Sequence, residues 1–256
     1  KVFYIAFRTP PKDSTGVAHI IEHTVLCGSR KFPVKDPFVE LAKGSLNTFL
    51  NAMTYPDKTV YPVASCNDRD FCNLMNVYLD AVFYPQIYSE RRIFEQEGWH
   101  YEAESREKGI SINGVVYNEM KGVMSSPDDV LEGAIMNSLF PHNTYAFESG
   151  GDPEDIPKLT YEDYLGFHSR YYHPSNSYIY LYGDGDVRAH LKYLNEEYLN
   201  AFEKQTIDSA IGTQEPLLQE QNLVAPYGVS REEPLENRAY LSLNYVLKDS
   251  LSYEEA

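Results

Sequence analysis

The sequence predicts an α+β fold in which a mixed, mainly antiparallel sheet is flanked by helices. Two observations support this prediction. Short runs of β-branched and aromatic residues indicate strands, and longer stretches with apolar residues at spacings of three and four indicate helices. Two neighbouring β-like runs, "LNTFLNAMTY" and "KTVYPVAS", meet at a Pro-Asp turn and are typical of an antiparallel hairpin. No short-period repeat is visible.

The chain begins with a strand, a loop and an apolar helix. "KVFYIAFR" is typical of a strand, and "TPPKDSTG" is a loop that leads into a helix over residues 16–27. Asp36 and Pro37 open a short helix that ends at Gly44. The hairpin described above follows this helix.

The middle of the chain is mainly helical. Residues 68–84 carry apolar side chains at helical spacing, and residues 89–105 are interpreted as a polar helix. A helix over residues 114–124 follows. The next helix begins at Ser126, which can cap it, with Pro127 in the first turn.

The last part of the chain indicates a domain boundary. Thr160 caps the helical "LTYEDYLGFHSRYY", "SNSYIYLYG" is a strand, and residues 187–202 form a helix. Residues 205–235 lose periodicity and are rich in Gln, Glu and Pro, which indicates a linker. "RAYLSLNYVL" then resumes as a strand. We therefore expect a domain over 1–204 that lacks its N-terminal strand or strands, a linker over 205–235, and the opening strand of a truncated second domain over 236–256.

Composition limits the class of protein. The 256 residues carry 22 Lys and Arg against 38 Asp and Glu, a formal net charge of −16. This charge argues against a nucleic-acid partner, and no apolar run approaches the length of a membrane span. Three cysteines, Cys27, Cys66 and Cys72, indicate a reducing compartment rather than a disulfide scaffold, and they lack zinc-finger spacing.

Three ionisable side chains interrupt the apolar helix over residues 16–27. His19 and His23 stand at i and i+4, so both imidazoles project from one face, and Glu22 lies beside them. Charges on a buried helix need partners or a metal. Neutral imidazoles bind zinc, and a neighbouring carboxylate can take a proton from water. This H-x-x-E-H order is typical of a class of zinc proteases and predicts a metal site.

The residues alone leave the third metal ligand open. Glu119 falls within an apolar helical stripe in "GVVYNEMKGV", where an unpaired carboxylate is unfavourable. Glu119 is therefore either a ligand or one partner of a buried ion pair with a lysine or arginine. The carboxylates of "YEAESREKG" are interpreted as a solvated face; they are Glu102, Glu104 and Glu107. The rival ligands are the remaining histidines, His100, His142, His168 and His173.

Several ordered motifs together resemble the presequence proteases of the pitrilysin family. They are "HIIEHTVLCGSRKFP", "LNAMTYPDKTVYPVAS", "DAVFYP", "QEGWHYE", "GVVYNEMKG", "SGGDPEDIP" and "YYHPSN", and they extend to about residue 204. The resemblance implies a pitrilysin or processing-peptidase-like metalloprotease domain with one Zn²⁺. It implies that His19, His23 and Glu119 bind the metal and that Glu22 is the catalytic general base.

The resemblance also implies a place for substrate. The strand near "FLNAMTY" would be a sheet edge onto which an extended peptide adds, with contacts from Asn51, Ala52, Met53 and Thr54. Met53 would lie near the pocket for the residue that follows the scissile bond. The alternative is an ordinary strand. Some relatives carry a further glutamate two turns before the third ligand, but this chain has Ile112 there, so we expect no supporting carboxylate at that position.

The resemblance implies a zinc metalloendopeptidase that degrades organellar presequences and other short unstructured peptides. An acidic chamber would favour basic presequences. The alternatives are a site-specific processing peptidase subunit, a catalytically dead peptide-binding homologue and a purely structural zinc site. Relatives act in the mitochondrial matrix or in plastids. In full-length relatives a second, C-terminal half contributes groups that bind substrate, so the resemblance implies such a half as a partner of this chain. We therefore expect this fragment to bind zinc and to cleave peptides weakly on its own.

Overall fold

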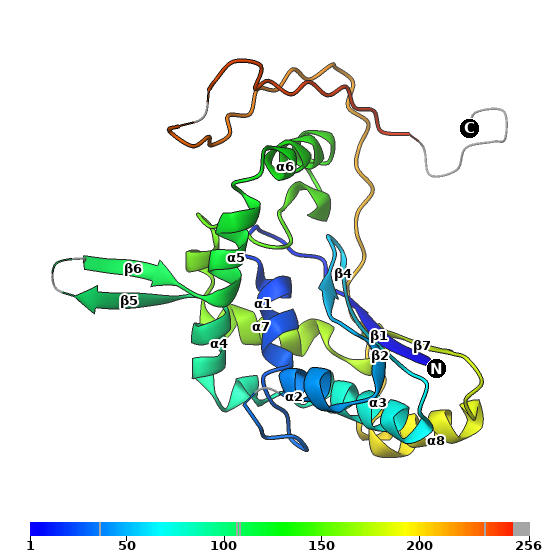
Figure 1. Ribbon diagram of the computed structural model, residues 1–256. Helices are drawn as coiled ribbons and strands as arrows, with labels where there is room; N and C mark the ends of the chain where they lie inside the picture. Colours follow the sequence, from blue (N-terminus) through cyan, green and yellow to red (C-terminus); the bar gives the residue numbers. More distant parts are fainter. Residues whose placement is uncertain (36, 106, 108, 233, 248–256) are drawn as a thin grey trace.

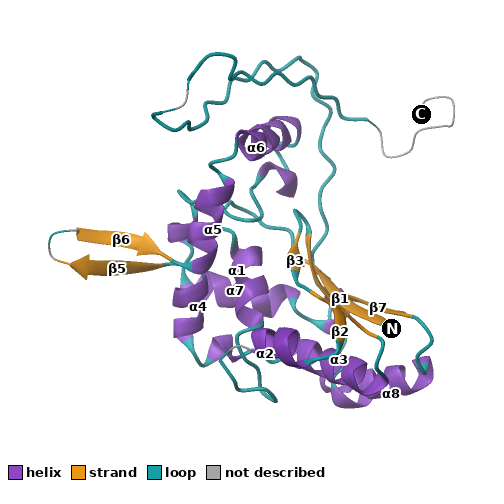
Figure 2. Ribbon diagram, viewed as in Figure 1, coloured by secondary structure: helices purple, strands orange, loops and turns teal. Residues whose placement is uncertain are grey.

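The computed structural model describes residues 1–35, 37–105, 107, 109–232 and 234–247. The strands are β1 (Val2–Arg8), β2 (Asn47–Leu50), β3 (Met53–Thr54), β4 (Lys58–Ser65), β5 (His100–Ser105), β6 (Gly109–Asn113) and β7 (Ser177–Tyr182). The α-helices are α1 (Val17–Val25), α2 (Pro37–Gly44), α3 (Asp68–Phe83), α4 (Arg91–Glu97), α5 (Val115–Val123), α6 (Pro127–Leu139), α7 (Tyr161–Tyr171) and α8 (Val187–Glu197). The main sheet lies beside the helices, and the β5–β6 hairpin projects away from them (Figures 1 and 2).

The main sheet is antiparallel, in the order β2-β4-β1-β7, with β3 also paired to β4. Side chains alternate across it, because successive residues of a strand point to opposite faces. The buried face of β1 includes Phe3, Ile5 and Phe7, each with 0% of its surface exposed. Tyr178 and Tyr182 on β7 are exposed on the other face. The α+β fold class expected from the sequence is confirmed.

Helix α1 runs through the core, as its apolar composition predicts. Ile20, Ile21 and Val25 are fully buried. Helix α7 packs against α1, and the Tyr164 hydroxyl donates a 2.6 Å hydrogen bond to Thr24 Oγ1. These contacts fix the orientation of α1, and with it the face on which its polar side chains lie.

Two predicted helix caps are confirmed. Ser126 and Thr160 accept hydrogen bonds from the backbone at the starts of α6 and α7. Asn67, which was not predicted as a cap, does the same at the start of α3. Pro37 opens α2 as expected, whereas Asp36 lies outside the described residues. Helix α8 ends at Glu197 and is followed by a 3₁₀ turn over Leu199–Ala201, so it is shorter than predicted.

The single polar helix predicted over residues 89–105 is wrong. Helix α4 ends at Glu97, and His100–Ser105 pairs antiparallel with Gly109–Asn113 as the β5–β6 hairpin. Gly98 interrupts the helix, and the strand character of the polar residues after it comes from pairing with a partner strand. Periodicity within one segment does not reveal such a partner.

The described residues between 203 and 247 contain neither helix nor strand. This matches the irregular structure expected over 205–235. The strand predicted from residue 238 is not formed as far as residue 247, since a strand requires a neighbour to satisfy its backbone groups. Residues 248–256 lie outside the described part, and the division into domains stays a prediction.

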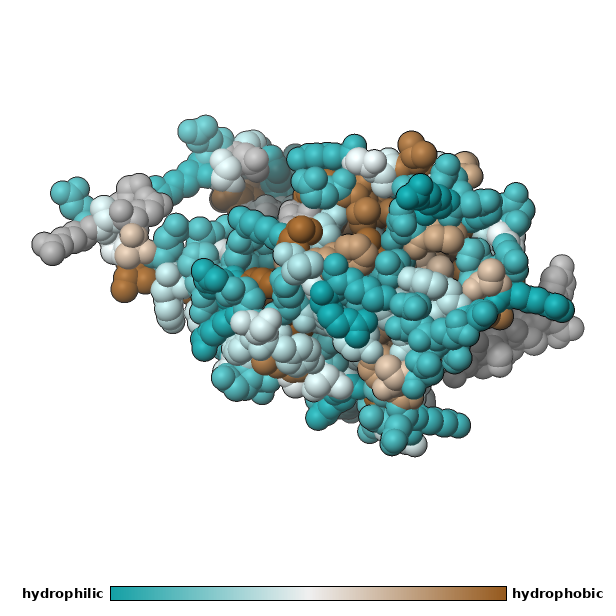
Figure 3. Space-filling view, turned by 90° about the horizontal axis from the view of Figure 1, so that it is seen from below, coloured by the Kyte–Doolittle hydropathy of each residue, from teal (hydrophilic) through white to brown (hydrophobic). Residues whose placement is uncertain are grey.

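The surface agrees with the composition of the chain. The face seen in Figure 3 is mainly hydrophilic, with smaller hydrophobic patches among the polar side chains. In the described part of the chain, Cys27, Cys66 and Cys72 form no disulfide bond. No helix in the described part of the chain is both long and apolar enough to cross a membrane.

One rival histidine belongs to the core and gives a prediction about pH. His168 Nε2 donates to the Val82 carbonyl oxygen at 3.0 Å, and Nδ1 accepts from the Tyr88 hydroxyl at 2.7 Å. Burial lowers the pKa of this imidazole to about 4. The pKa of histidine in an unfolded chain is about 6.5. The folded state, which keeps the ring neutral, therefore gains its full stabilisation above that pH and loses it as the pH falls toward 4.

We expect the free energy of unfolding of the wild-type chain to fall by about 3 kcal/mol more than that of His168→Gln between pH 7 and pH 4. Glutamine retains one donor and one acceptor but does not titrate. Urea unfolding at a series of pH values measures the difference. Parallel pH profiles for the two proteins would contradict the prediction.

Candidate metal centre

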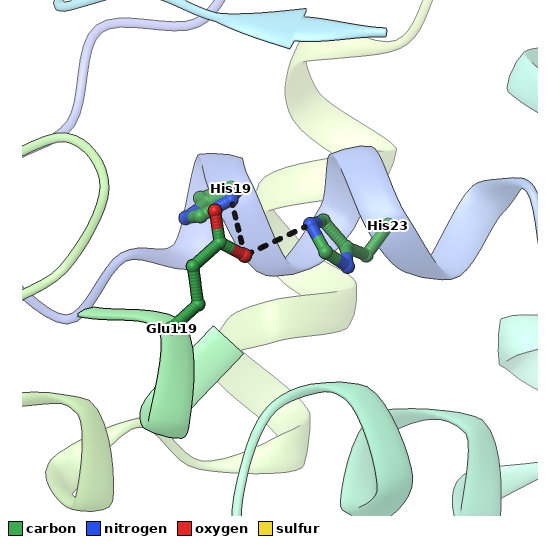
Figure 4. Close-up of side chains that lie close together, drawn as sticks. All are labelled: His19, His23 and Glu119. Carbon is green, nitrogen blue, oxygen red and sulfur yellow. Dashed lines mark ion pairs between the residues drawn. The ribbon is translucent and has the colours of Figure 1, made fainter. Parts of the chain in front are cut away.

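Helices α1 and α5 bring three potential metal ligands together. His19 Nε2 and His23 Nε2 lie 3.8 and 3.7 Å from Glu119 Oε2. In the described part of the chain, the ligand atoms of these three residues lie within 4.8 Å of one another. Figure 4 shows the Glu119 carboxylate reaching from α5 toward both imidazoles on α1.

The hydrogen bond of His19 defines its tautomer. Its Nδ1 lies 2.9 Å from the carbonyl oxygen of Gly150. A carbonyl only accepts hydrogen bonds, so Nδ1 carries the proton, and the neutral ring then presents an unprotonated Nε2 toward Glu119. This is the protonation state that a zinc ligand requires.

His23 has a carboxylate behind it. Its Nδ1 lies 3.3 Å from Glu97 Oε2, at the last position of α4, and Gln96 Nε2 donates to Glu97 Oε1 at 2.8 Å. Burial lowers the pKa of the His23 imidazole, but the hydrogen bond to Glu97 and the nearby carboxylate charges outweigh it, so the pKa is raised overall. Burial acts to raise the pKa of Glu97, but the hydrogen bonds from His23 and Gln96 outweigh this effect. The pKa of Glu97 is therefore lowered overall.

Glu97 was not among the residues expected at the site from the sequence. The supporting carboxylate was considered only at the position of Ile112, which lies on β6. The β5–β6 hairpin separates α4 from α5, so a carboxylate on the helix before the hairpin takes the place beside the ligands. The motif "QEGWHYE" contained this glutamate, but its contact with His23 spans 74 residues.

Glu22 lies on the same helix and is buried, with 8% of its surface exposed. Its Oε2 accepts a 2.7 Å hydrogen bond from Thr54 Oγ1 on β3. Burial, together with the charge of Glu22, raises the pKa of the neighbouring Tyr78 phenol. The carboxylate thus lies between the candidate ligands and the edge of the sheet.

Strand β3 and the residues before it occupy one edge of the sheet. The backbone N–H groups of Asn51 and Tyr55 donate to Pro62 and Lys58, and Met53 is registered with Val60. Side chains at Asn51, Ala52, Met53 and Thr54 are exposed or half-buried. Contact of these four residues with substrate stays a prediction.

Comparisons with known proteins identify the family. A family model described as Insulinase (Peptidase family M16) matches residues 8–148, which is more than half of the chain. The chain belongs to peptidase family M16. A second model, described as Peptidase M16 inactive domain, matches residues 158–256 of this M16 chain.

The M16 chain is 58% identical over its full length to "Protein HypA" of Clostridium perfringens and covers 26% of that protein. It is 53% identical, over 97% of its length, to "Presequence protease 1, chloroplastic/mitochondrial" of Arabidopsis thaliana, of which it covers 23%. It is 50% identical to "Presequence protease, mitochondrial" of Drosophila melanogaster over 78% of its length, covering 19%. The chain therefore spans about a quarter or less of the length of each relative. Identities of 50% and 53% to two presequence proteases confirm the resemblance expected from the sequence.

Solved structures agree on the fold. Pitrilysin superposes with a TM-score of 0.61 at 18% identity, covering 82% of this chain and 21% of pitrilysin. A protease from Helicobacter pylori gives 0.59 at 19% identity, covering 84% of this chain and 48% of that protein. At these identities the likeness concerns the fold alone.

The rival histidines of the M16 chain do not join the cluster. His100 Nδ1 is 2.8 Å from the Glu95 carbonyl oxygen, and His173 Nδ1 accepts from Ser175 N at 3.1 Å. His168 lies in the core and His142 is exposed. Within the described residues, Glu119 contacts the two α1 histidines and forms no ion pair with a lysine or arginine.

The surroundings of Glu119 differ from the sequence prediction. Val116 and Met120 are buried as expected, but Val115 is exposed, and 48% of the Glu119 side chain is accessible. The buried residues of α5 are Val116 and Met120, so Glu119 lies beside the buried stripe and not within it. Glu119 lies at the open side of the candidate centre.

Close backbone packing holds α5 in position and gives a second prediction. A Cβ atom on Gly114, which precedes α5, would lie 2.1 Å from the carbonyl oxygen of Gly98. We expect Gly114→Ala to lower the free energy of unfolding by about 1–3 kcal/mol, because backbone must move to make room. Urea denaturation measures this change.

The control is Gly122→Ala, within α5, where an added Cβ meets nothing within 4 Å. Alanine is the better helix former, so we expect this variant to be neutral or up to about 1 kcal/mol more stable. Equal effects of the two substitutions would argue against close packing of α5 on the end of α4.

Proposed function

We propose that this chain is the catalytic part of a zinc metalloendopeptidase that degrades presequences and other short unstructured peptides. The observation that supports it best is the convergence of two Nε2 atoms from α1 and a carboxylate oxygen from α5. Names of the relatives support the substrate class.

The three side chains fit a zinc ion. Tetrahedral zinc with bonds of about 2.0–2.2 Å separates two ligand atoms by about 3.4 Å, so the separations of 3.7 and 3.8 Å need only a small adjustment. The donor set of two imidazoles and one carboxylate is typical of catalytic sites with a position left open. When bound, zinc would polarise the scissile carbonyl and make water more acidic.

The residues of the chain would perform the remaining steps. His19, His23 and Glu119 would hold the ion. Glu22 would accept a proton from the attacking water and deliver it to the leaving amine. The edge at β3 would hold an extended peptide through main-chain hydrogen bonds, largely irrespective of sequence.

The remaining parts of the proposal concern partner and location. The C-terminal half of the same enzyme would complete the substrate chamber, and the acidic charge would favour basic presequences. We therefore expect this chain alone to bind zinc but to cleave peptides weakly. Animal and plant relatives carry mitochondrial or chloroplastic names, whereas HypA comes from a bacterium. A mitochondrial or plastid location thus stays a prediction.

The deciding experiment is an anomalous-difference map at the zinc edge from crystals of this chain. We expect a peak about 2.0–2.2 Å from His19, His23 and a Glu119 oxygen. A map without a peak, in which Glu119 pairs with a lysine or arginine away from His19, would overturn the proposal.

Glu97 gives a third prediction, since it would orient His23 toward the metal. We expect Glu97→Ala to weaken zinc affinity by about 10- to 100-fold, the range typical of carboxylates that hydrogen-bond a histidine ligand. Competition with a fluorescent chelator measures the affinity.

Glu95→Gln is the matched control for Glu97→Ala. Glu95 lies on the same helix, but it is partly exposed and pairs with Arg91. We expect the zinc affinity of this control to equal that of the wild type. Wild-type affinity in the Glu97→Ala variant would mean that the contact with His23 does not contribute to metal binding.

A further inference from the structure

Thr54 contacts Glu22 through its side chain and belongs to the edge strand through its main chain. Its Oγ1 donates to Glu22 Oε2 at 2.7 Å. Strand β3 pairs with β4 through Thr54 and Thr59, and α1 packs against β3. From the sequence, Thr54 was expected only as a substrate contact, so its side-chain contact with Glu22 is an additional feature.

We propose that Thr54 is a positioning residue whose hydroxyl holds the Glu22 carboxylate in the orientation for proton transfer, while its main chain faces the edge at which the peptide adds. This inference rests on the proposed function, because it assigns Glu22 the role of general base. It adds to that function a residue with two roles: the Thr54 side chain orients the general base, and the Thr54 main chain belongs to the edge that would bind the peptide.

The burial of Glu22 explains why the hydroxyl matters. Only 8% of the residue is exposed, so solvent offers few donors to its carboxylate. The nearby Tyr78 hydroxyl is engaged elsewhere, since it donates to the Asn51 carbonyl oxygen at 3.2 Å. A hydrogen bond to a charged acceptor is stronger than one between neutral groups. Loss of the Thr54 hydroxyl would leave the carboxylate free to rotate away from the substrate.

The register of the strand places the Thr54 main chain at the open edge. Asn51 and Tyr55 donate their N–H groups to β4, at Pro62 and Lys58. In an antiparallel strand these groups alternate in direction, so the N–H and C=O groups of Thr54 point away from β4. An added peptide strand would meet those groups. The Glu22 carboxylate is therefore hydrogen-bonded to the side chain of a residue whose main chain would bind the scissile segment.

The test compares Thr54→Val, which removes the hydroxyl at equal size, with Thr54→Ser, which keeps it, in the full-length protein loaded with zinc. We expect valine to lower kcat by about 10- to 100-fold while KM and zinc content change by less than about twofold. Serine should restore most of kcat. Thr48→Val, an exposed threonine on neighbouring β2, is the matched control and should behave as wild type.

A second measurement separates positioning from a general structural role. In a Glu22→Gln background, Thr54→Val should cause no further loss of the residual rate, because both substitutions act through the same carboxylate. The affinity of Glu22→Gln for an uncleaved peptide should also be unchanged by the valine. Crystals of Thr54→Val should contain the Glu22 carboxylate in a rotated position.

Three results would overturn the inference: wild-type kcat in Thr54→Val, a valine effect of full size in the Glu22→Gln background, or failure of serine to restore kcat. If the valine variant does not fold, Thr54→Ala removes the hydroxyl and is interpreted in the same way. A wild-type protein that binds zinc and hydrolyses no peptide would contradict the proposed function instead, so the two failures are distinguishable.

Discussion

Replacing Glu22 with glutamine is expected to lower kcat for peptide hydrolysis by about 10³- to 10⁴-fold and to leave bound zinc unchanged. Glutamine has nearly the same shape and can still accept the Thr54 hydrogen bond. It cannot take a proton from water, and positioned general acid–base catalysis contributes about 10²–10⁴ in rate, with two transfers here depending on one group. The imidazole Nε2 atoms that face Glu119 are not altered by the change.

The measurement combines steady-state hydrolysis of a basic presequence peptide with metal analysis of the same sample. Glu40→Gln, which removes an exposed carboxylate on α2, controls for the lost charge and should behave as wild type. Loss of zinc together with activity would assign the effect to the metal centre. Wild-type turnover in Glu22→Gln would exclude Glu22 as the base. It would favour a structural role for zinc, because the loss of this carboxylate should not affect a structural zinc site.

Local sequence was sufficient for the part of the site that lies on one helix. His19, Glu22 and His23 occur within five positions, and the helical period alone puts them on adjacent faces. The third member, Glu119, required the resemblance. From residues alone it remained one of several candidates, because its approach to α1 depends on how α5 packs.

The surroundings of the centre could not be predicted in the same way, because they come from tertiary contacts. The Gly150 carbonyl that orients His19 is 131 residues away, and Glu97 reaches His23 across 74 residues. Glu97 was not predicted, because a helix was expected over residues 89–105 where the structure has the end of α4 followed by the β5–β6 hairpin. Strand pairing is non-local, and the same reason explains why the strand predicted from residue 238 is not formed in the described part of the chain, which reaches residue 247.

Replacing Glu119 with alanine is expected to remove zinc binding and, with it, the stabilisation that metal gives to the fold. The ligands belong to α1 and α5, which meet only in the folded state, so zinc should bind the native chain far more tightly than the unfolded one. Free zinc at about a thousand times Kd should stabilise the wild-type chain by about 4 kcal/mol. Glu119→Ala should lose nearly all of this increment.

Thermal or urea unfolding with and without a zinc chelator measures the increment in each protein. Lys121→Ala, on the same helix, keeps the three ligands and should respond to the chelator as the wild type does. Without zinc, Glu119→Ala should be about as stable as the metal-free wild type, because 48% of the Glu119 side chain is exposed and little packing is lost. A chelator effect of equal size in wild type and Glu119→Ala would show that any stabilising metal binds elsewhere, and would remove Glu119 from the ligand set.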